Sequence, residues 1–333
     1  MSKGTVFLTG ASGFLGSHIA AKLLTAGYGL RVSFRTQRKS DDFLSFFPDS
    51  NIQTCIVPDI TARGAYGNSF EGCDYVIHCE SPYSFKIDDI QKDLIEPAVE
   101  GTNEILSAVA AAFSVKRVVL TSSFAAIVNP FEGPRPGYTY TGSLTNLRGT
   151  EQDWNPITLE KVGDNKIFGY LASKKLAEKA AWDFIDAQTS TQSPVSLVTV
   201  CPPMIFGPAH PAAGISLSHL NESSAQLLAA VKGDNVAPVR MPVFMDVRDV
   251  ADIHVASLDQ DKVAGSERFI VCGGKYTWLA VQQLAQGQMP TGETMAQADE
   301  YYSLDPSKVE KMLEVEWTSL ENCVGEFMST IGL

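Results

Sequence analysis

Short apolar runs alternate with longer amphipathic stretches along the first two thirds of the chain. A run of four to six apolar residues bounded by turn formers is typical of a buried strand, whereas apolar residues at every third or fourth position over a longer stretch are typical of a helix. Strands are predicted near residues 4–9, 30–35, 52–57, 74–79, 116–122 and 196–201. Helices are predicted over residues 14–27, 89–113, 165–188, 222–232, 248–258, 277–287 and 306–314.

This alternation predicts an α/β fold with a Rossmann-type, doubly wound parallel sheet. Two irregular stretches, 129–164 and 202–221, interrupt it, and long loops inside compact domains are usually functional. We expect the sheet domain to comprise residues 1–200 with parts of 240–275. A smaller C-terminal substrate-binding lobe would then comprise mainly 202–240 and 275–333, with a discontinuous boundary between the two.

A glycine-rich turn follows the first predicted strand directly. Gly10, Gly13 and Gly16 stand three residues apart where the chain passes from strand to helix. Gly10 permits a tight turn, Gly13 allows the backbone to approach a pyrophosphate, and Gly16 lets the helix pack closely on the strand. The N-terminus of that helix supplies N–H groups and positive potential for phosphates. A plain strand-to-helix turn is the alternative, but the context favours a dinucleotide site.

Basic residues follow the second predicted strand, where NAD-binding proteins carry an acidic one. Arg35, Arg38 and Lys39 stand there. An acidic side chain would bind the ribose 2′-hydroxyl of NAD, whereas a guanidinium can grip a 2′-phosphate with two hydrogen bonds. We therefore predict NADPH as the cofactor, with Arg35 as the main reader of the 2′-phosphate and Lys39 beside it. A solvated basic patch at the start of a surface helix is the alternative.

Tyr170 and Lys174 are candidate catalytic residues because four residues on a helix bring a phenol and an ammonium onto one face. A neighbouring cation favours the phenolate, so the pair can protonate a carbonyl oxygen at neutral pH. Ser123, just past the fifth predicted strand, can hydrogen-bond the same oxygen. The alternatives are a half-buried Tyr beside a solvated Lys, and a hydroxyl that caps the loop backbone, as we expect for Thr121 and Ser122.

Composition and charge limit the range of partners. The chain of 333 residues is 44% hydrophobic and 19% charged, as in ordinary soluble proteins. A net charge of −12 opposes binding to nucleic acid or anionic membranes, so small molecules are the expected partners. No apolar run reaches the roughly 18 residues of a membrane helix, and the N-terminus does not resemble a signal peptide.

The cysteines show no metal-binding pattern. With few histidines and no C-x-x-C spacing they form no zinc site, so no metal is predicted. Reduced thiols in the core of a cytoplasmic enzyme are the expected use of these residues. The six are Cys55, Cys73, Cys79, Cys201, Cys272 and Cys323.

Taken together, these features make the chain resemble the extended short-chain dehydrogenase/reductase family. The glycine signature, Ser123 and the Tyr170/Lys174 pair occur in the same order as in that family and at about the same spacing. More narrowly, the chain is similar to the dihydroflavonol-4-reductase-like branch, and within it to the fungal NADPH-dependent methylglyoxal and ketone reductases. The segments that carry this narrower likeness are residues 120–126, 153–156, 173–182 and 246–251.

The resemblance implies a role for each site residue. Tyr170 would protonate the carbonyl oxygen, Ser123 would orient it, and Lys174 would lower the pKa of Tyr170 while binding the nicotinamide ribose. It also implies cofactor contacts: backbone N–H groups of Phe14 and Leu15 to the pyrophosphate, Asp59 and Ile60 beside the adenine, Pro202 at the turn that holds the carboxamide, and Ser216 at a phosphate.

Several positions depart from the pattern of that family. Glu80 stands where relatives often have a small residue, close to the expected path of the cofactor, and we interpret it as pointing to solvent. Cys201 replaces a frequent Asn or Arg. Five apolar residues are candidates for the substrate pocket, although each is equally consistent with ordinary core: Phe85, Val128, Phe131, Met204 and Phe206.

The sequence thus predicts an NADPH-dependent carbonyl reductase, acting on a small aldehyde or ketone as a monomer or homodimer. Alternatives are a 3β-hydroxysteroid-type dehydrogenase, a nucleotide-sugar epimerase or dehydratase, and a dinucleotide-sensing regulator without catalysis. The sensor has no need of a proton donor, so the three candidate catalytic residues argue against it. The sequence leaves the physiological substrate and the stereochemistry of the alcohol open.

Overall fold

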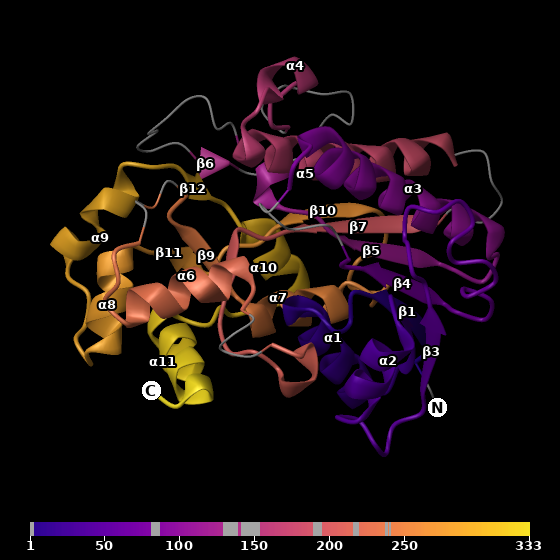
Figure 1. Ribbon diagram of the computed structural model, residues 1–333, viewed down its shortest axis with the longest axis horizontal. Coiled ribbons are helices and arrows are strands. Elements are labelled where there is room, and N and C mark those ends of the chain that lie inside the picture. The colour runs from indigo at the N-terminus through magenta and orange to yellow at the C-terminus, as the bar shows by residue number, and fades with distance from the viewer. Residues whose placement is uncertain are drawn as a thin grey trace.

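The computed structural model describes residues 3–80, 87–128, 139–140, 154–188, 195–215, 220–236, 239 and 241–333. A seven-stranded parallel sheet runs through the larger part of the molecule in the order β10-β7-β5-β4-β1-β2-β3 (Figure 1). Val6 of β1 lies opposite Leu30 of β2 on one side and Tyr75 of β4 on the other. The strands are β1 (Thr5–Thr9), β2 (Gly29–Phe34), β3 (Ile52–Ile56), β4 (Tyr75–His78), β5 (Arg117–Thr121), β7 (Ser196–Cys201) and β10 (Glu267–Ile270).

The doubly wound sheet and all six predicted strands are confirmed. Strand β10 was missed because its four residues begin with Glu267 and Arg268, which hide the apolar pattern of a buried strand. The side chains of Glu267 and Arg268 are tolerated in the strand because oppositely charged residues from other elements form ion pairs with them. The chain order reverses between β1 and β4, and at such a point a crevice for a ligand opens at the carboxyl ends of the strands.

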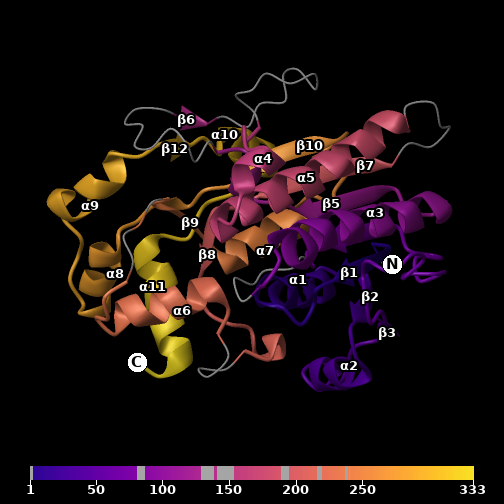
Figure 2. The same ribbon diagram turned by 45° about the horizontal axis from the view of Figure 1, so that its top comes forward.

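Helices cover both faces of the sheet, as Figures 1 and 2 show from two angles. Alternate residues of each strand enter opposite cores, as the two-residue period of a strand requires. Val6 and Leu8 pack in one core with Ile19, while Phe7 packs in the other with Ile105. The first core lies under α1 (Phe14–Thr25), α7 (Val247–Ala256) and α10 (Ser307–Leu313), and the second under α3 (Glu96–Ala111) and α5 (Lys166–Ala187).

A smaller lobe lies beside the sheet, at the left of Figure 1. Its core packs Phe206, Phe244, Tyr276 and Phe327 between a three-stranded sheet, in the order β11-β9-β8, and helices. The chain leaves this lobe at α7 and β10 and returns to it at β11. Strand β9, at 243–246, belongs to the sheet of this lobe, whereas Val309 and Leu313 of α10 pack in the core of the large sheet. The elements are β8 (Met204–Phe206), β9 (Val243–Asp246), β11 (Gly274–Lys275), α6 (Glu222–Val231), α8 (Trp278–Ala285), α9 (Gly292–Asp299) and α11 (Leu320–Ile331).

Shorter elements complete the described chain. Strand β12 (Ser303–Leu304) pairs with β6 (Thr139–Tyr140), which joins the C-terminal part of the chain to the long irregular excursion. Helix α2 (Gln37–Leu44) follows β2, a turn of π-helix (Gln91–Ile95) leads into α3, and α4 (Leu159–Val162) precedes α5. Within the described residues, no helix has both the length and the apolar character needed to span a membrane.

A buried ion pair fastens α5 to the sheet. Glu178 of α5 and Arg268 of β10 both have fully buried side chains, and Arg268 Nε donates to Glu178 Oε1 at 2.7 Å while its Nη2 donates to Oε2 at 3.1 Å. The carboxylate also accepts hydrogen bonds from Ser122 at 2.6 Å, Thr199 at 3.1 Å and Trp182 Nε1 at 3.2 Å. These donors give both oxygens of the buried carboxylate hydrogen-bond partners. A buried ion pair is tolerated when its remaining polar atoms are hydrogen-bonded in this way.

We expect Arg268→Met to lower the free energy of unfolding by about 3–5 kcal/mol, because it leaves the Glu178 carboxylate buried without its counter-ion. Urea denaturation measures this loss. The control is Lys179→Met on the same helix, which breaks the exposed pair between Lys179 Nζ and Asp183 Oδ1 (2.8 Å) and should cost about 0.5 kcal/mol or less. Similar losses in both variants would contradict the assignment.

Candidate active site

Steric contacts explain the three glycines of the first turn. Gly10 has φ +72°, a left-handed conformation that favours glycine, and accepts a hydrogen bond from the N–H of Gly13 at 2.9 Å. A Cβ on Gly16 would lie only 2.1 Å from the carbonyl oxygen of Gly10. The first N–H groups of α1, on Phe14 and Leu15, have no acceptor within the helix and lie at its positive end. The turn therefore fits a pyrophosphate.

Two basic side chains lie at the carboxyl end of β2. Arg35 and Lys39 are both exposed, on either side of Thr36, whose hydroxyl caps α2 by accepting from the N–H of Lys39 at 3.3 Å. Asp59, also exposed, belongs to the same corner. Hydrogen bonds from Thr61 lower the pKa of Asp59, and the charge of Arg35 lowers it further. Arg35 and Asp59 thus lie near enough for their charges to interact, and Ile60, the residue after Asp59, is buried.

Ser123, Tyr170 and Lys174 come together from two elements. Ser123 follows β5 and begins a short 3₁₀ helix (Phe124–Ala126), and its hydroxyl accepts a hydrogen bond from the N–H of Ala125 at 3.1 Å. Tyr170 and Lys174 lie one turn apart on α5, with Lys174 Nζ 5.7 Å from the centroid of the Tyr170 ring. The hydroxyl of Ser123 also hydrogen-bonds the phenol of Tyr170. A hydroxyl, a phenol and an ammonium thus converge.

Burial sets the proton affinities of this trio. Desolvation raises the pKa of Tyr170, and the hydrogen bond to Ser123 opposes this only in part. The direction is opposite to the lowering that the sequence predicts, because desolvation of the phenolate is the largest influence on this pKa. Burial also lowers the pKa of Lys174 to about 8. At neutral pH the phenol keeps its proton, and the lysine is mostly charged.

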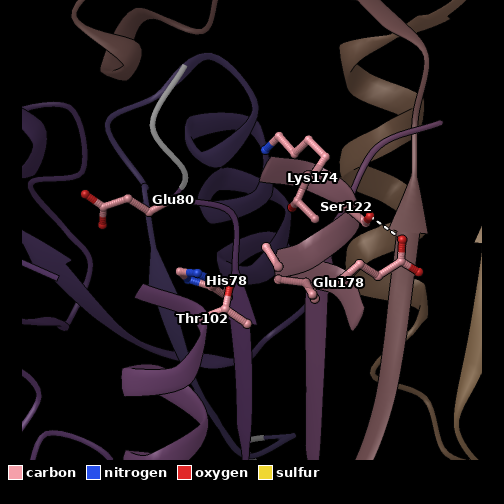
Figure 3. Close-up of a pocket in the computed structure, with 9 residues that line it drawn as sticks. His78, Glu80, Thr102, Ser122, Lys174 and Glu178 are labelled. Atoms are coloured by element: carbon pink, nitrogen blue, oxygen red, sulfur yellow. Dashed lines mark hydrogen bonds between the residues drawn. The ribbon is translucent and has the colours of Figure 1, made fainter. Parts of the chain in front are cut away.

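A cavity of about 10 Å³ lies beside Lys174, room for about one water molecule. Figure 3 shows His78, Glu80, Ser122 and Glu178 around it. His78 Nδ1 is hydrogen-bonded to Thr9 Oγ1 at 2.7 Å, and burial lowers the pKa of His78 to about 3, so the ring is neutral. Among the described residues no oxygen accepts a hydrogen bond from Lys174 Nζ, whose donors are available to ligand hydroxyls. That arrangement fits a nicotinamide ribose.

Glu80 does not simply point into solvent, as the sequence-based interpretation had it. Its side chain is half-buried, and in Figure 3 its carboxylate points away from Ser122 and Glu178. Burial raises the pKa of Glu80, while the charges of Arg35 and Lys39 lower it. The backbone of Glu80 lies against the glycine turn, since a Cβ on Gly10 would lie 3.0 Å from Glu80 N.

The structure places the predicted pocket residues in different environments. Phe206 is fully buried in the core of the small lobe, with its ring centroid 5.0 Å from that of Tyr276, so it is a core residue and not a pocket wall. Val128 is buried beside Phe124, and Met204 is half-buried against the lobe core. Two of the predicted pocket residues and one predicted phosphate contact lie outside the described residues: Phe85, Phe131 and Ser216.

Pro202 is buried, and its carbonyl accepts a hydrogen bond from the N–H of Phe124 at 3.1 Å. This bond holds the turn after β7 against the residue that follows Ser123.

Sequence reasoning missed His78 and Glu178 as residues of the site. Glu178 could have been found, since it stands one helical turn after Lys174, but nothing in the sequence marks its partners. In the described part of the chain no three or more His, Cys, Asp or Glu side chains form a group that could hold a metal ion.

Comparisons with known proteins agree with this geometry. Residues 7–276 match the model of the 3-beta hydroxysteroid dehydrogenase/isomerase family. The chain is 34% identical to a ketoreductase of Aspergillus niger, over 98% of this chain and 97% of that protein. It is 31% identical to an NADPH-dependent methylglyoxal reductase of Saccharomyces cerevisiae, over 98% of each. A crystal structure of Gre2 from Candida albicans in complex with NADPH has a TM-score of 0.88 at 29% identity, covering 98% of each chain. The resemblance inferred from the sequence is confirmed.

The lowered pKa of Lys174 predicts a pH-dependent stability difference. An unfolded lysine titrates near pH 10.4, so burying the ammonium costs free energy at every pH below about 8, and this cost fades as pH rises toward the unfolded pKa. We expect Lys174→Met to be more stable than the wild type at pH 7, on the order of 2 kcal/mol. Urea denaturation between about pH 7 and 10 should show this advantage shrinking. The same advantage at every pH, or a shrinking advantage in the exposed Lys179→Met control, would contradict the assignment.

Proposed function

The chain belongs to the 3-beta hydroxysteroid dehydrogenase/isomerase family, and from that premise we propose that it is an NADPH-dependent carbonyl reductase. It transfers a hydride to an aldehyde or ketone and releases an alcohol. The observation that carries the proposal is the convergence of Ser123, Tyr170 and Lys174 at the carboxyl end of β5, next to the crevice that the glycine turn borders. The names of similar proteins, a ketoreductase and an NADPH-dependent methylglyoxal reductase, support both the reaction and the cofactor.

The residues of the crevice fit NADPH from one end to the other. The N–H groups of Phe14 and Leu15 bind the pyrophosphate, and Arg35 with Lys39 binds the 2′-phosphate. Lys174 donates to the nicotinamide ribose hydroxyls. When bound, the cofactor supplies the hydride from C4 of its nicotinamide. The remaining proposed contacts are Asp59 and Ile60 at the adenine, Pro202 at the carboxamide and Ser216 at a phosphate.

The protein delivers the proton that reduction requires. Ser123 donates a hydrogen bond to the substrate oxygen, and the N–H of Ala125 helps to hold the Ser123 hydroxyl in place. As negative charge develops on that oxygen, the O–H of Tyr170 gives up its proton to it. The raised pKa of Tyr170 keeps the proton in place until then, and the charge of Lys174 stabilises the phenolate that remains.

Other members of this fold use a similar trio in different reactions. A 3β-hydroxysteroid-type dehydrogenase runs the oxidation, and an epimerase or dehydratase adds groups that recognise a sugar nucleotide. The reductase names of relatives that match almost the whole chain favour reduction. We further propose a cytoplasmic enzyme that acts as a monomer or homodimer on small carbonyl compounds. Its six cysteines are free thiols, in keeping with a reducing compartment.

NADPH oxidation across a panel of aldehydes, ketoesters and diketones, with chiral analysis of the products, tests the function. We expect turnover with part of the panel, and a loss of about 100-fold or more in kcat for Tyr170→Phe, because that variant lacks the proton donor. Binding of NADPH to this variant should change little in a fluorescence titration. No turnover of any carbonyl with either cofactor would contradict the function, and full activity of Tyr170→Phe would refute the donor role.

Arg35→Ala tests how the 2′-phosphate is recognised. We expect KM for NADPH to rise about tenfold or more, because a hydrogen bond to a charged group contributes about 1.5–3 kcal/mol, while KM for NADH changes little. The matched control is Arg38→Ala. Arg38 has a side chain that is 92% exposed and pairs loosely with Asp42 at 3.8 Å, so its loss should affect neither cofactor. Equal effects of Arg35→Ala on both cofactors would mean that Arg35 does not bind the 2′-phosphate.

A further inference from the structure

Glu80 lies at the edge of the sheet where the proposed nucleotide crevice opens. It follows β4 by two residues, at the edge of the sheet where the chain order reverses between β4 and β1. A Cβ on Gly10 would lie 3.0 Å from Glu80 N and 3.2 Å from its Cα, so the two backbones are in close contact. The N–H of Glu80 donates to Thr9 Oγ1 at 3.3 Å, which ties it to the end of β1. These contacts hold Glu80 beside the turn that cradles the pyrophosphate.

The carboxylate of Glu80 lies within range of the charges of the two cations proposed to hold the 2′-phosphate. Arg35 and Lys39 lie near enough for their charges to favour its ionised form, against the effect of burial. Among the described residues, none donates a hydrogen bond to this carboxylate, and none forms an ion pair with it. In Figure 3 its oxygens are turned away from Ser122 and Glu178 on the far side of the small cavity. The crevice thus contains a built-in anion next to the binding place of an anionic ligand.

A fixed negative charge at this position acts differently on the two forms of the cofactor. Both carry the pyrophosphate, but only NADPH brings a 2′-phosphate toward Arg35 and Lys39. Like charges repel, and the carboxylate also reduces the positive potential that the two cations offer. We propose that Glu80 is a specificity-determining residue whose ionised carboxylate weakens binding of the 2′-phosphate and so lowers the preference for NADPH over NADH. This inference rests on the proposed function.

Three other titratable groups near Glu80 are neutral around neutral pH. Burial raises the pKa of Tyr66 and of Cys79, and the charge of Glu80 contributes to both shifts, so neither ionises near neutral pH. His78 on β4 has a pKa of about 3 and stays neutral. Lys174, which lines the same small cavity as Glu80, has a pKa of about 8 and gains charge as the pH falls, in the wild type and in a Glu80 variant alike. The charge of Glu80 itself is what a comparison of the wild type with Glu80→Gln isolates.

Fluorescence titration of the purified protein with NADPH and with NADH tests the proposal without turnover. We expect Glu80→Gln to lower Kd for NADPH by about three- to tenfold at pH 7.5 and to leave Kd for NADH unchanged. Glu80→Ala should act in the same direction, which separates the charge from the shape of the side chain. Glu71→Gln, which removes an exposed carboxylate from the loop before β4, is the matched control and should leave both constants unchanged.

The pH dependence gives a second readout. As pH falls through the raised pKa of Glu80, its carboxyl becomes neutral in the wild type. The ratio of NADPH dissociation constants, wild type over Glu80→Gln, should then fall toward one as the pH is lowered from about 7.5 through the raised pKa of Glu80. Protonation of the 2′-phosphate in the free cofactor is common to both proteins and cancels in the ratio.

Each outcome decides the matter. An unchanged or higher Kd for NADPH in both variants would overturn the proposal, as would equal tightening of NADPH and NADH, which would place the effect at the shared pyrophosphate. Weaker NADH binding with NADPH unaffected would overturn it too, since Glu80 would then be a hydrogen-bond acceptor for a ribose. In all three cases the proposed function stands, because the wild type still binds NADPH. A wild type that binds neither cofactor would overturn both.

Discussion

The buried pair of Glu178 and Arg268 is the contact on which the geometry of the site depends. Helix α5 carries Tyr170, Lys174 and Glu178 at successive turns, so whatever fixes Glu178 also fixes the two catalytic candidates. The carboxylate of Glu178 reaches β10 through Arg268, β7 through Thr199 and the end of β5 through Ser122. Because Ser122 precedes Ser123, the same carboxylate sets the distance between the phenol and the serine hydroxyl. Such a pair adds little net stability, since desolvation offsets the attraction, but it tolerates few alternative geometries.

Burial, more than charge pairing, sets the protonation states around the site. It raises the pKa of Tyr170, lowers that of Lys174 to about 8 and keeps His78 neutral. These directions suit a donor that must hold its proton until charge develops on a substrate oxygen. The chain carries a net charge of −12, yet its nucleotide corner gathers positive groups at the helix N-terminus and at Arg35. A local arrangement of donors therefore decides anion binding, and the overall charge does not.

Local patterns predicted local features well. The spacing of Gly10, Gly13 and Gly16 was sufficient for the first turn, because a Cβ at Gly16 collides with a carbonyl only six residues away along the chain. Six of the seven strands followed from apolar runs. Tyr170 and Lys174 lie on one helical face because that follows from helix geometry alone. Each of these inferences depends on residues that are close in sequence.

What the sequence could not provide were contacts between distant residues. Strand β10 was hidden by charges whose partners lie in α5 and elsewhere, and the core position of Phe206 depends on Tyr276. The contact between the backbone of Glu80 and the glycine turn after β1 joins residues seventy positions apart. The raised pKa of Tyr170 follows from desolvation, which spacing cannot show. The sequence by itself determined the α/β fold, the glycine turn and the reacting groups, since short-range sterics and periodicity dictate them. Only the tertiary structure decided which charges are buried and which groups face them, because burial is a property of the packed chain.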